Sequence, residues 1–320
     1  MKSNFFESNL WVEKYRPKNL SQLVLDDHVS YSITQDINKK EMGNYLFYGP
    51  PGTGKTTISR IIINNIMEDN DNVLYLNGSS ERTIDILRNK ITNFLTVDPF
   101  GNDRYKVVFI DEADNLTDVF FKALRNFIEK YTEIGRFIFT CNYITRIPKP
   151  IQSRFRVYEL KPMSDEMIKN LCYNILNNEN VQYQKEHVDM IVNIRKPDIR
   201  AILQLLQQHV VNNELKLPDI NTLIRKEDQL VSLTIETIKA KISKQATFLT
   251  LRDKIEKIIM DKNIDYVNVF EKLFISDELP ALSKVIINKY VNSLNNVVSY
   301  SMHYMACIYE IITMIEDMNK

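Results

Sequence analysis

A chain of 320 residues is too long for one small hydrophobic core and suits two or three domains. Its 44% hydrophobic and 26% charged residues are ordinary for a globular protein and show no bias toward disorder. The chain has 41 lysines and arginines and 41 aspartates and glutamates. Because there is no overall basic excess, the net charge does not indicate a nucleic-acid partner.

Three widely separated cysteines, Cys141, Cys172 and Cys307, form no C-x-x-C pair and have no histidine at ligand spacing. They predict neither a disulfide framework nor a zinc site, which fits a reducing compartment. The start MKSNFFESNLW is too short and too polar for a signal peptide, and no apolar run reaches the roughly 20 residues of a membrane helix. We expect an intracellular, soluble protein that binds no membrane.

Short apolar runs alternate with helical patterns from about residue 44 to residue 160. The predicted strands are NYLFYG, NVLYLN, KVVFID, GRFIFTCN and RVYEL, with a helix after each of the first three. This alternation is typical of a parallel sheet covered by helices on both faces. In such a sheet the functional site lies at the strand ends.

The pattern changes after Pro162, where we expect helices and no further strands. SDEMIKNLCYNIL, KEHVDMIVNI and PDIRAILQLLQQHV read as three amphipathic helices, and a polar stretch near residues 215–228 precedes a helical remainder. Apolar residues surround much of the last helix, so a domain or subunit interface must cover them. The sequence therefore predicts an α/β domain over 1–162, a small helical domain over 163–228 and a helical domain over 229–320.

One motif indicates a phosphate site. The eight residues that match G-x-x-x-x-G-K-[ST], followed by Thr57, are Gly49, Pro50, Pro51, Gly52, Thr53, Gly54, Lys55 and Thr56. They follow the strand YLFY and open a helix, which is the context that the motif requires. Lys55 would reach the β- and γ-phosphates of ATP, and Thr56 would hold Mg²⁺.

Two adjacent carboxylates follow the apolar strand KVVFI, and neighbouring strand residues face opposite ways. Asp111 is the natural magnesium partner of Thr56, whereas Glu112 can act on the water that attacks the γ-phosphate. The alternative is a solvated acidic turn that caps the next helix, which suits Asp114 better. We favour hydrolysis over nucleotide binding alone, because a protein that only binds ATP does not need Glu112.

From about residue 8 to residue 205 the chain resembles AAA+ ATPases, and among them the replication factor C small subunits. The matching strings are WVEKYRPKNLSQLV, GPPGTGKT, DEAD and FTCNY. The resemblance implies an AAA+ P-loop domain, a helical lid and a C-terminal helical collar. It places Tyr15, Arg16 and Pro17 beside the adenine and makes Asn142 the sensor residue. Length and spacing look most like the T4-type phage clamp loaders, whose location would be the cytoplasm of the host cell.

The stretch KPIQSRFRVYEL contains Arg154, which has no acidic residue within two positions on either side. The family's Ser-Arg-Cys motif supplies an arginine finger to ATP bound by the neighbouring subunit. Here the motif reads Ser153-Arg154-Phe155, so the resemblance implies that Arg154 acts in trans and that its partner is in another chain. A structural arginine at the start of a strand is the alternative.

Two further sets of arginines follow from the resemblance. The family's Gly-Asp-x-Arg pattern stands here as Pro197 to Arg200, which implies that Arg200 contacts the γ-phosphate from the lid. The segment SSERTIDILRNK is similar to one that faces DNA in the family, so Arg82 and Arg88 are candidate DNA-backbone contacts. A solvated helix surface is the alternative in both cases.

The resemblance implies an ATP hydrolase that loads a sliding clamp onto primer-template DNA, with ATP and Mg²⁺ as cofactors. Its partners would be copies of itself and a non-identical clamp-loader subunit in a pentameric ring. An AAA+ DNA motor such as a branch-migration helicase is the main alternative. A scaffold with vestigial hydrolysis is a third possibility, which Glu112, Asn142 and Arg154 argue against.

Overall fold

The computed structural model describes residues 9–80, 84–217, 226–242, 264–294 and 297–318. Contacts divide the chain into two units, Met1–Leu217 and Pro218–Lys320. The predicted boundary between residues 228 and 229 falls inside a helix, α11 (Lys226–Ile242). The polar residues before that boundary form the first turn of α11, where the acidic Glu227 and Asp228 suit the positive end of the helix dipole.

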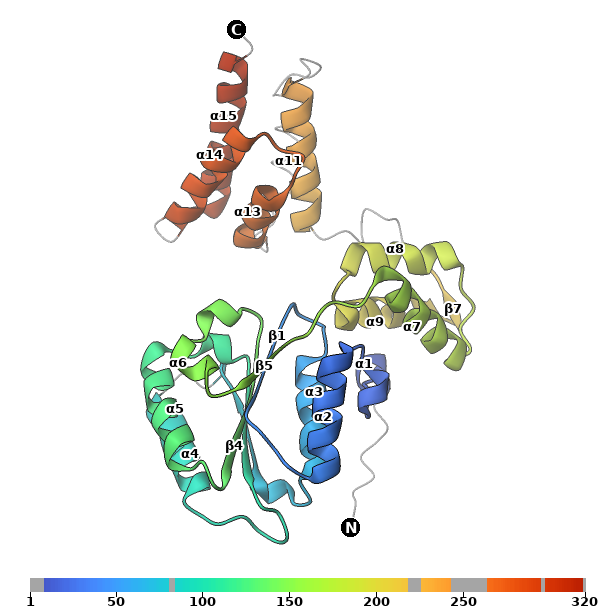
Figure 1. Ribbon diagram of the computed structural model, residues 1–320. Coiled ribbons are helices and arrows are strands. Elements are labelled where there is room, and N and C mark those ends of the chain that lie inside the picture. The colour runs from blue at the N-terminus through green and yellow to red at the C-terminus, as the bar shows by residue number, and fades with distance from the viewer. Residues whose placement is uncertain (1–8, 81–83, 218–225, 243–263, 295–296, 319–320) are drawn as a thin grey trace. The chain divides into compact units, whose positions relative to one another are not determined.

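The first unit contains a five-stranded parallel sheet in the order β2-β3-β4-β1-β5 (Figure 1). Its strands are β1 (Tyr45–Tyr48), β2 (Val73–Asn77), β3 (Lys106–Asp111), β4 (Gly135–Cys141) and β5 (Arg156–Glu159). These are the five strands expected from the sequence, and the predicted α/β class is confirmed. Because all strands are parallel, the carboxyl ends of β1, β3 and β4 meet at one edge.

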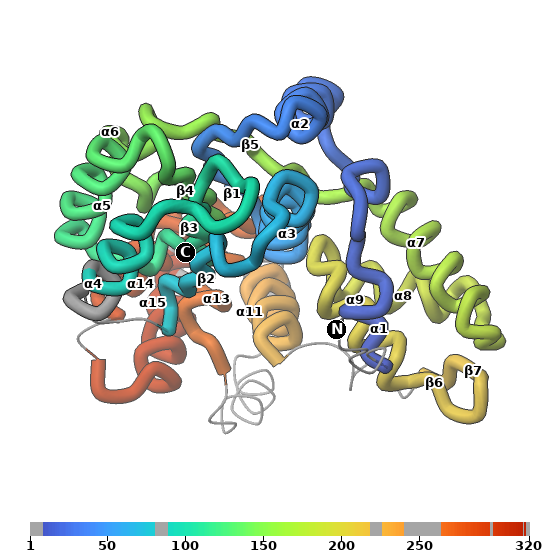
Figure 2. The backbone as a smooth tube through the Cα atoms, turned by 90° about the horizontal axis from the view of Figure 1, so that it is seen from below, coloured from blue at the N-terminus to red at the C-terminus, as the bar shows by residue number. Residues whose placement is uncertain are grey.

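Side chains of the sheet alternate between two apolar layers. Leu46, Val108 and Phe139 pack on one face, and Phe47 and Ile138 pack on the other. Figures 1 and 2 show helices on both sides of the sheet. The first face is covered by α4 (Ile84–Leu95), α5 (Asp118–Lys130) and α6 (Lys149–Gln152), and the second by α2 (Asp27–Lys39) and α3 (Lys55–Ile66).

A smaller helical part completes the first unit. Its elements are α7 (Asp165–Asn178), α8 (Lys185–Arg195), α9 (Ile199–Gln208), β6 (Val210–Val211) and β7 (Glu214–Leu215). The short antiparallel hairpin corrects the expectation that no strand follows residue 162. Asn212 and Asn213, both with positive φ, form its turn, which is a common two-residue hairpin connection. The N-terminal α1 (Trp11–Lys14) packs against α9.

The second unit is all helical in its described residues, with α11, α13 (Tyr266–Ile275), α14 (Ala281–Ser293) and α15 (Tyr300–Met318). One face of α15 is buried in the core of this unit through Tyr304, Ile308 and Ile311. Met302 and Tyr309 are exposed on the same helix, at 74% and 61%. Among the described helices, none is long and apolar enough to span a membrane.

Candidate active site

The loop between β1 and α3 approaches its neighbours so closely that two of its glycines leave no room for a side chain. A Cβ at Gly49 would lie 2.3 Å from the carbonyl oxygen of Leu160, and one at Gly52 would lie 2.9 Å from the Cα of Asp198. Both glycines have positive φ, at 145° and 80°. The loop leads directly into the N-terminus of α3, whose free N–H groups and dipole favour a phosphate.

Lys55 is the first residue of α3, and its Nζ folds back over the loop. It donates hydrogen bonds of 2.8 Å to the carbonyl oxygens of Gly49 and Pro50. Burial lowers the pKa of Lys55, and the nearby Arg200 acts in the same direction. A partly buried ammonium group at this position is suited to bind phosphate oxygens.

Thr56 and Asp111 meet where α3 begins and β3 ends. The Thr56 hydroxyl lies 3.1 Å and 3.0 Å from the two carboxylate oxygens of Asp111. The Thr140 hydroxyl, from β4, also donates to Asp111. Hydroxyl and carboxylate oxygens are the hard ligands that Mg²⁺ prefers, so Thr56 and Asp111 fit the predicted magnesium site.

Glu112 leaves the strand in the left-handed conformation, with φ of 55°. The two adjacent carboxylates therefore diverge because β3 ends at Asp111, and not through continued strand alternation. The hydroxyl of Ser79 donates to Glu112, and Asn115 Nδ2 donates to Ser79 Oγ at 2.8 Å. Ser79 and Asn115 thus orient the carboxylate, which lines the same cavity as Lys55 and Thr56.

Asp114 is only 8% exposed, which corrects the view of a solvated helix cap. Its Oδ2 accepts hydrogen bonds from the backbone N–H groups of Asn142 at 3.1 Å and Tyr143 at 3.2 Å. The cap of α5 is Thr117, whose side chain accepts from the N–H of Phe120. Asp114 therefore fixes the end of β4 where Asn142 lies.

A cavity of about 760 Å³ lies between the sheet and the lid helices and brings most of the predicted residues together. The predicted residues that line it are Tyr15, Arg16, Pro17, Pro51, Gly52, Thr53, Gly54, Lys55, Thr56, Thr57, Asp111, Glu112, Asn142 and Arg200. Apolar side chains that the sequence did not single out also line it, and they suit a flat aromatic base. They are Leu23, Val24, Met163, Leu171, Ile175 and Leu203.

The N-terminal segment is joined to the lid by polar contacts. Tyr15 donates from its hydroxyl to Glu179 Oε1 at 2.7 Å, and Lys14 forms an ion pair with the same oxygen at 2.7 Å. Burial, followed by the bond to Glu179, raises the pKa of Tyr15 to about 12. Tyr15 therefore stays a neutral donor at physiological pH.

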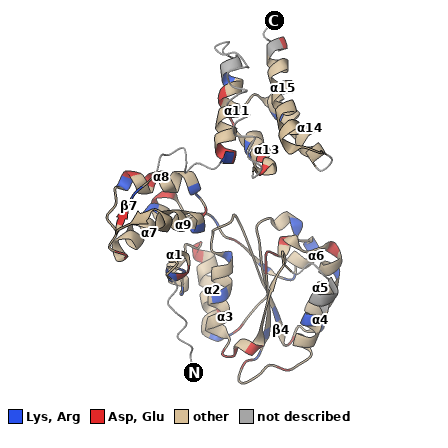
Figure 3. Ribbon diagram, turned by 180° about the vertical axis from the view of Figure 1, so that it is seen from behind, with Lys and Arg blue, Asp and Glu red and all other residues tan. Residues whose placement is uncertain are grey.

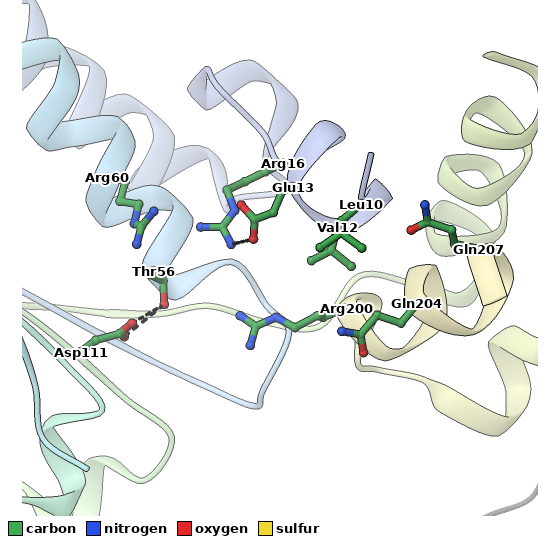
Figure 4. Close-up of a pocket in the computed structure, with 10 residues that line it drawn as sticks. All are labelled: Leu10, Val12, Glu13, Arg16, Thr56, Arg60, Asp111, Arg200, Gln204 and Gln207. Carbon is green, nitrogen blue, oxygen red and sulfur yellow. Dashed lines mark hydrogen bonds and ion pairs between the residues drawn. The ribbon is translucent and has the colours of Figure 1, made fainter. Parts of the chain in front are cut away.

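Three arginines surround a smaller pocket of about 320 Å³ that also includes Thr56 and Asp111. Figure 4 shows Arg16, Arg60 and Arg200 reaching it from the N-terminal segment, α3 and α9. Asp198 begins α9 by accepting from the N–H of Ala201 at 3.1 Å, which places Arg200 in the first turn. Arg60 was not predicted. It lies one helical turn after Thr56 and therefore on the same face of α3, which could have pointed to it.

Arg154 lies outside the cavity, and although it has no acidic neighbour in the local sequence, it has a partner elsewhere in its own chain. Its Nη2 forms an ion pair with Glu129 of α5, and its Nη1 donates to the carbonyl oxygen of Pro150 at 2.6 Å. Phe155 is buried and packs on Phe139 with ring centroids 4.6 Å apart. Arg156 pairs with Asp36 at 2.5 Å.

The candidate DNA contacts are not placed by the structure. Arg82 lies outside the described residues, and Arg88 belongs to α4 but its side chain is not described. Figure 3 shows basic and acidic residues mixed over the helices of the first unit. The roles of Arg82 and Arg88 stay predictions.

All three cysteines are buried, including Cys141, which lies at the wall of the cavity. Burial raises the pKa of each thiol to about 12. Because the thiolate is the reactive form, about one thiol in 10⁴ is ionised at pH 8. We expect an aromatic disulfide reagent to label none of the three in the folded chain and all three in denaturant. Rapid release of one chromophore equivalent from the native protein would contradict this.

Comparisons with known proteins agree with this geometry. The family described as "ATPase family associated with various cellular activities (AAA)" matches residues 45–163. The replication factor C small subunit of Sulfurisphaera tokodaii is 33% identical, over 83% of this chain and 81% of that protein. The small subunit of Methanococcus maripaludis is 33% identical, over 82% and 84%. The solved RuvB Holliday junction branch migration motor of Thermotoga maritima has a TM-score of 0.54, over 90% and 91% of the two chains, at 15% identity, a likeness of fold alone.

Proposed function

This chain belongs to the replication factor C small-subunit family of AAA ATPases, and we propose that it is the ATPase subunit of a sliding-clamp loader. In this proposal, ATP binding lets the assembled subunits open a ring clamp and place it on primer-template DNA. Hydrolysis then releases the loaded clamp. The resemblance to T4-type phage loaders stays a prediction.

One observation carries the ATPase part of the proposal: residues of five kinds line one cavity between sheet and lid. They are the phosphate loop with Lys55, the Thr56–Asp111 pair, the carboxylate Glu112, the polar Asn142 and the lid arginine Arg200. A protein that only binds nucleotide has no use for an oriented carboxylate beside the phosphate site. The site therefore supports hydrolysis.

Each of these residues has its own role in the proposed reaction. Lys55 and Arg200 bind the β- and γ-phosphates, and Thr56 with Asp111 would hold Mg²⁺, which neutralises phosphate charge when bound. Glu112 takes a proton from the attacking water, and Asn142 helps to position that water or the γ-phosphate. Arg154 of the next subunit stabilises the charge that develops in the transition state.

The proposed partners are copies of this chain and a non-identical subunit in a pentameric ring, a sliding clamp and primer-template DNA. Arg82 and Arg88 would contact the DNA backbone. Exposed apolar side chains of the second unit, among them Val285 and Met302, are available to neighbouring collar helices. This fits an assembly held together by its C-terminal units.

The steady-state ATPase rate tests the proposal. The purified chain is assembled with the non-identical subunit. The complex is then titrated with primer-template DNA in the presence and absence of the sliding clamp. We expect clamp and primer-template together to stimulate hydrolysis by more than the product of their separate effects. Equal stimulation by any DNA, whether or not the clamp is present, would contradict the loader and favour a DNA motor.

A further inference from the structure

The guanidinium group of Arg154 is held by its own chain on both of its terminal nitrogens. Nη2 pairs with the Glu129 carboxylate and Nη1 donates to Pro150 O at 2.6 Å. These two nitrogens form the fork with which an arginine binds a phosphate through two parallel hydrogen bonds. While both contacts hold, the fork is not free for a phosphate.

Glu129 has a second cationic neighbour on its own helix. Arg125, one turn earlier on α5, donates from Nε to Glu129 Oε1 at 3.2 Å, and Arg154 binds this same oxygen. The hydrogen bond from Arg154 is the largest cause of the lowered pKa of Glu129, and that from Arg125 is the next. If Arg154 leaves, Glu129 keeps Arg125 as a partner, so release does not leave an unpaired carboxylate.

Both side chains of the Arg154–Glu129 pair are partly exposed to solvent, so the ion pair can open. The Arg154 side chain is 26% exposed and that of Glu129 is 49% exposed, so water can solvate both groups when they separate. Behind them Phe155 is buried on Phe139, which anchors the backbone next to Arg154. The guanidinium group can therefore move away from Glu129 while the backbone of Arg154 stays in place.

We propose that Glu129 holds Arg154 in a withdrawn position and that this contact must open before Arg154 can engage ATP bound by a neighbouring copy of the chain. This inference rests on the proposed function, because it assumes that Arg154 acts in trans. Glu129 never touches the nucleotide. It competes with the γ-phosphate for one guanidinium group and so makes full activity depend on a correctly placed neighbour.

The size of the effect follows from the nature of the contact. Exposed ion pairs are weak and are screened by salt. For Glu129→Gln we therefore expect kcat/KM for ATP in the assembled complex to rise by about two- to fivefold at low salt. The ratio of kcat/KM between the variant and the unchanged complex should approach one as the salt concentration approaches 1 M, where the screening length is about 3 Å.

The experiment measures kcat/KM for four assembled complexes: unchanged, Glu129→Gln, Arg154→Ala and the double variant. We expect Glu129→Gln to raise kcat/KM only where Arg154 is present, which a general loss of negative charge would not explain. Glu133→Gln serves as the matched control, because Glu133 is a nearby exposed acid with no role in the proposal. It should leave kcat/KM unchanged.

Each other outcome has a definite meaning. A fall or no change in kcat/KM for Glu129→Gln would overturn the withdrawn position, as would an equal rise in the Arg154→Ala background. If Arg154→Ala itself hydrolyses ATP normally, the trans role in the proposed function fails instead. The two failures are thus distinguished by the same set of proteins.

Discussion

Replacing Glu112 with glutamine is expected to lower ATP hydrolysis by about 10²- to 10⁴-fold while ATP binding changes little. The amide keeps the shape of the side chain, and its oxygen can still accept the hydrogen bond from Ser79. It cannot take a proton from water at neutral pH. Single-turnover hydrolysis by the assembled complex measures the chemical step, and equilibrium binding of ATP measures the affinity.

Glu133→Gln is the control for this substitution too, since it makes the same chemical change at an exposed position. It should hydrolyse ATP at the unchanged rate. If Glu112→Gln kept more than about a third of the rate, the base would have to be another group. If it instead lost ATP affinity tenfold or more, Glu112 would act in binding and not in proton transfer.

The strands and the phosphate loop were predictable because their signals are local. The apolar runs that become β1 and β3 are each bounded by turn or motif residues, and the spacing from Gly49 to Thr56 fixes a known backbone path. The hairpin at Asn212 and Asn213 was equally local. It was missed because its strands are only two residues long, although two asparagines in a row are a hairpin signal.

The contacts that complete the site were not predictable, because they join residues far apart in the chain. The Arg154–Glu129 pair spans 25 positions, and Asp114 reaches the backbone of Asn142 across 28. The first depends on the packing of α5 against α6, which ends just before Arg154, and the second on the pairing of β3 with β4. A search for acidic neighbours within two positions of Arg154 could not find Glu129.

Lys55→Ala and Arg154→Ala are each expected to abolish most hydrolysis, and their mixture is expected to recover it. The first removes the cation that binds the phosphates, and the second removes an arginine finger, whose loss costs on the order of 10³-fold or more in rate. In an interface that joins different faces of identical subunits, an intact site in one chain can meet an intact finger in the other. Random assembly of equal amounts makes about one such interface in four, so we expect about a quarter of the full rate.

The mixed complexes are measured with saturating ATP, clamp and primer-template DNA, after size analysis shows that both variants have assembled. Arg156→Ala is the matched control, because Arg156 lies two residues further on and pairs with Asp36 of its own chain. It should retain hydrolysis without mixing. If the mixture forms rings of normal size but is as inactive as its two components, Arg154 does not act on ATP bound by the neighbouring subunit. Recovery near one quarter would require that the finger and the phosphate loop come from different chains.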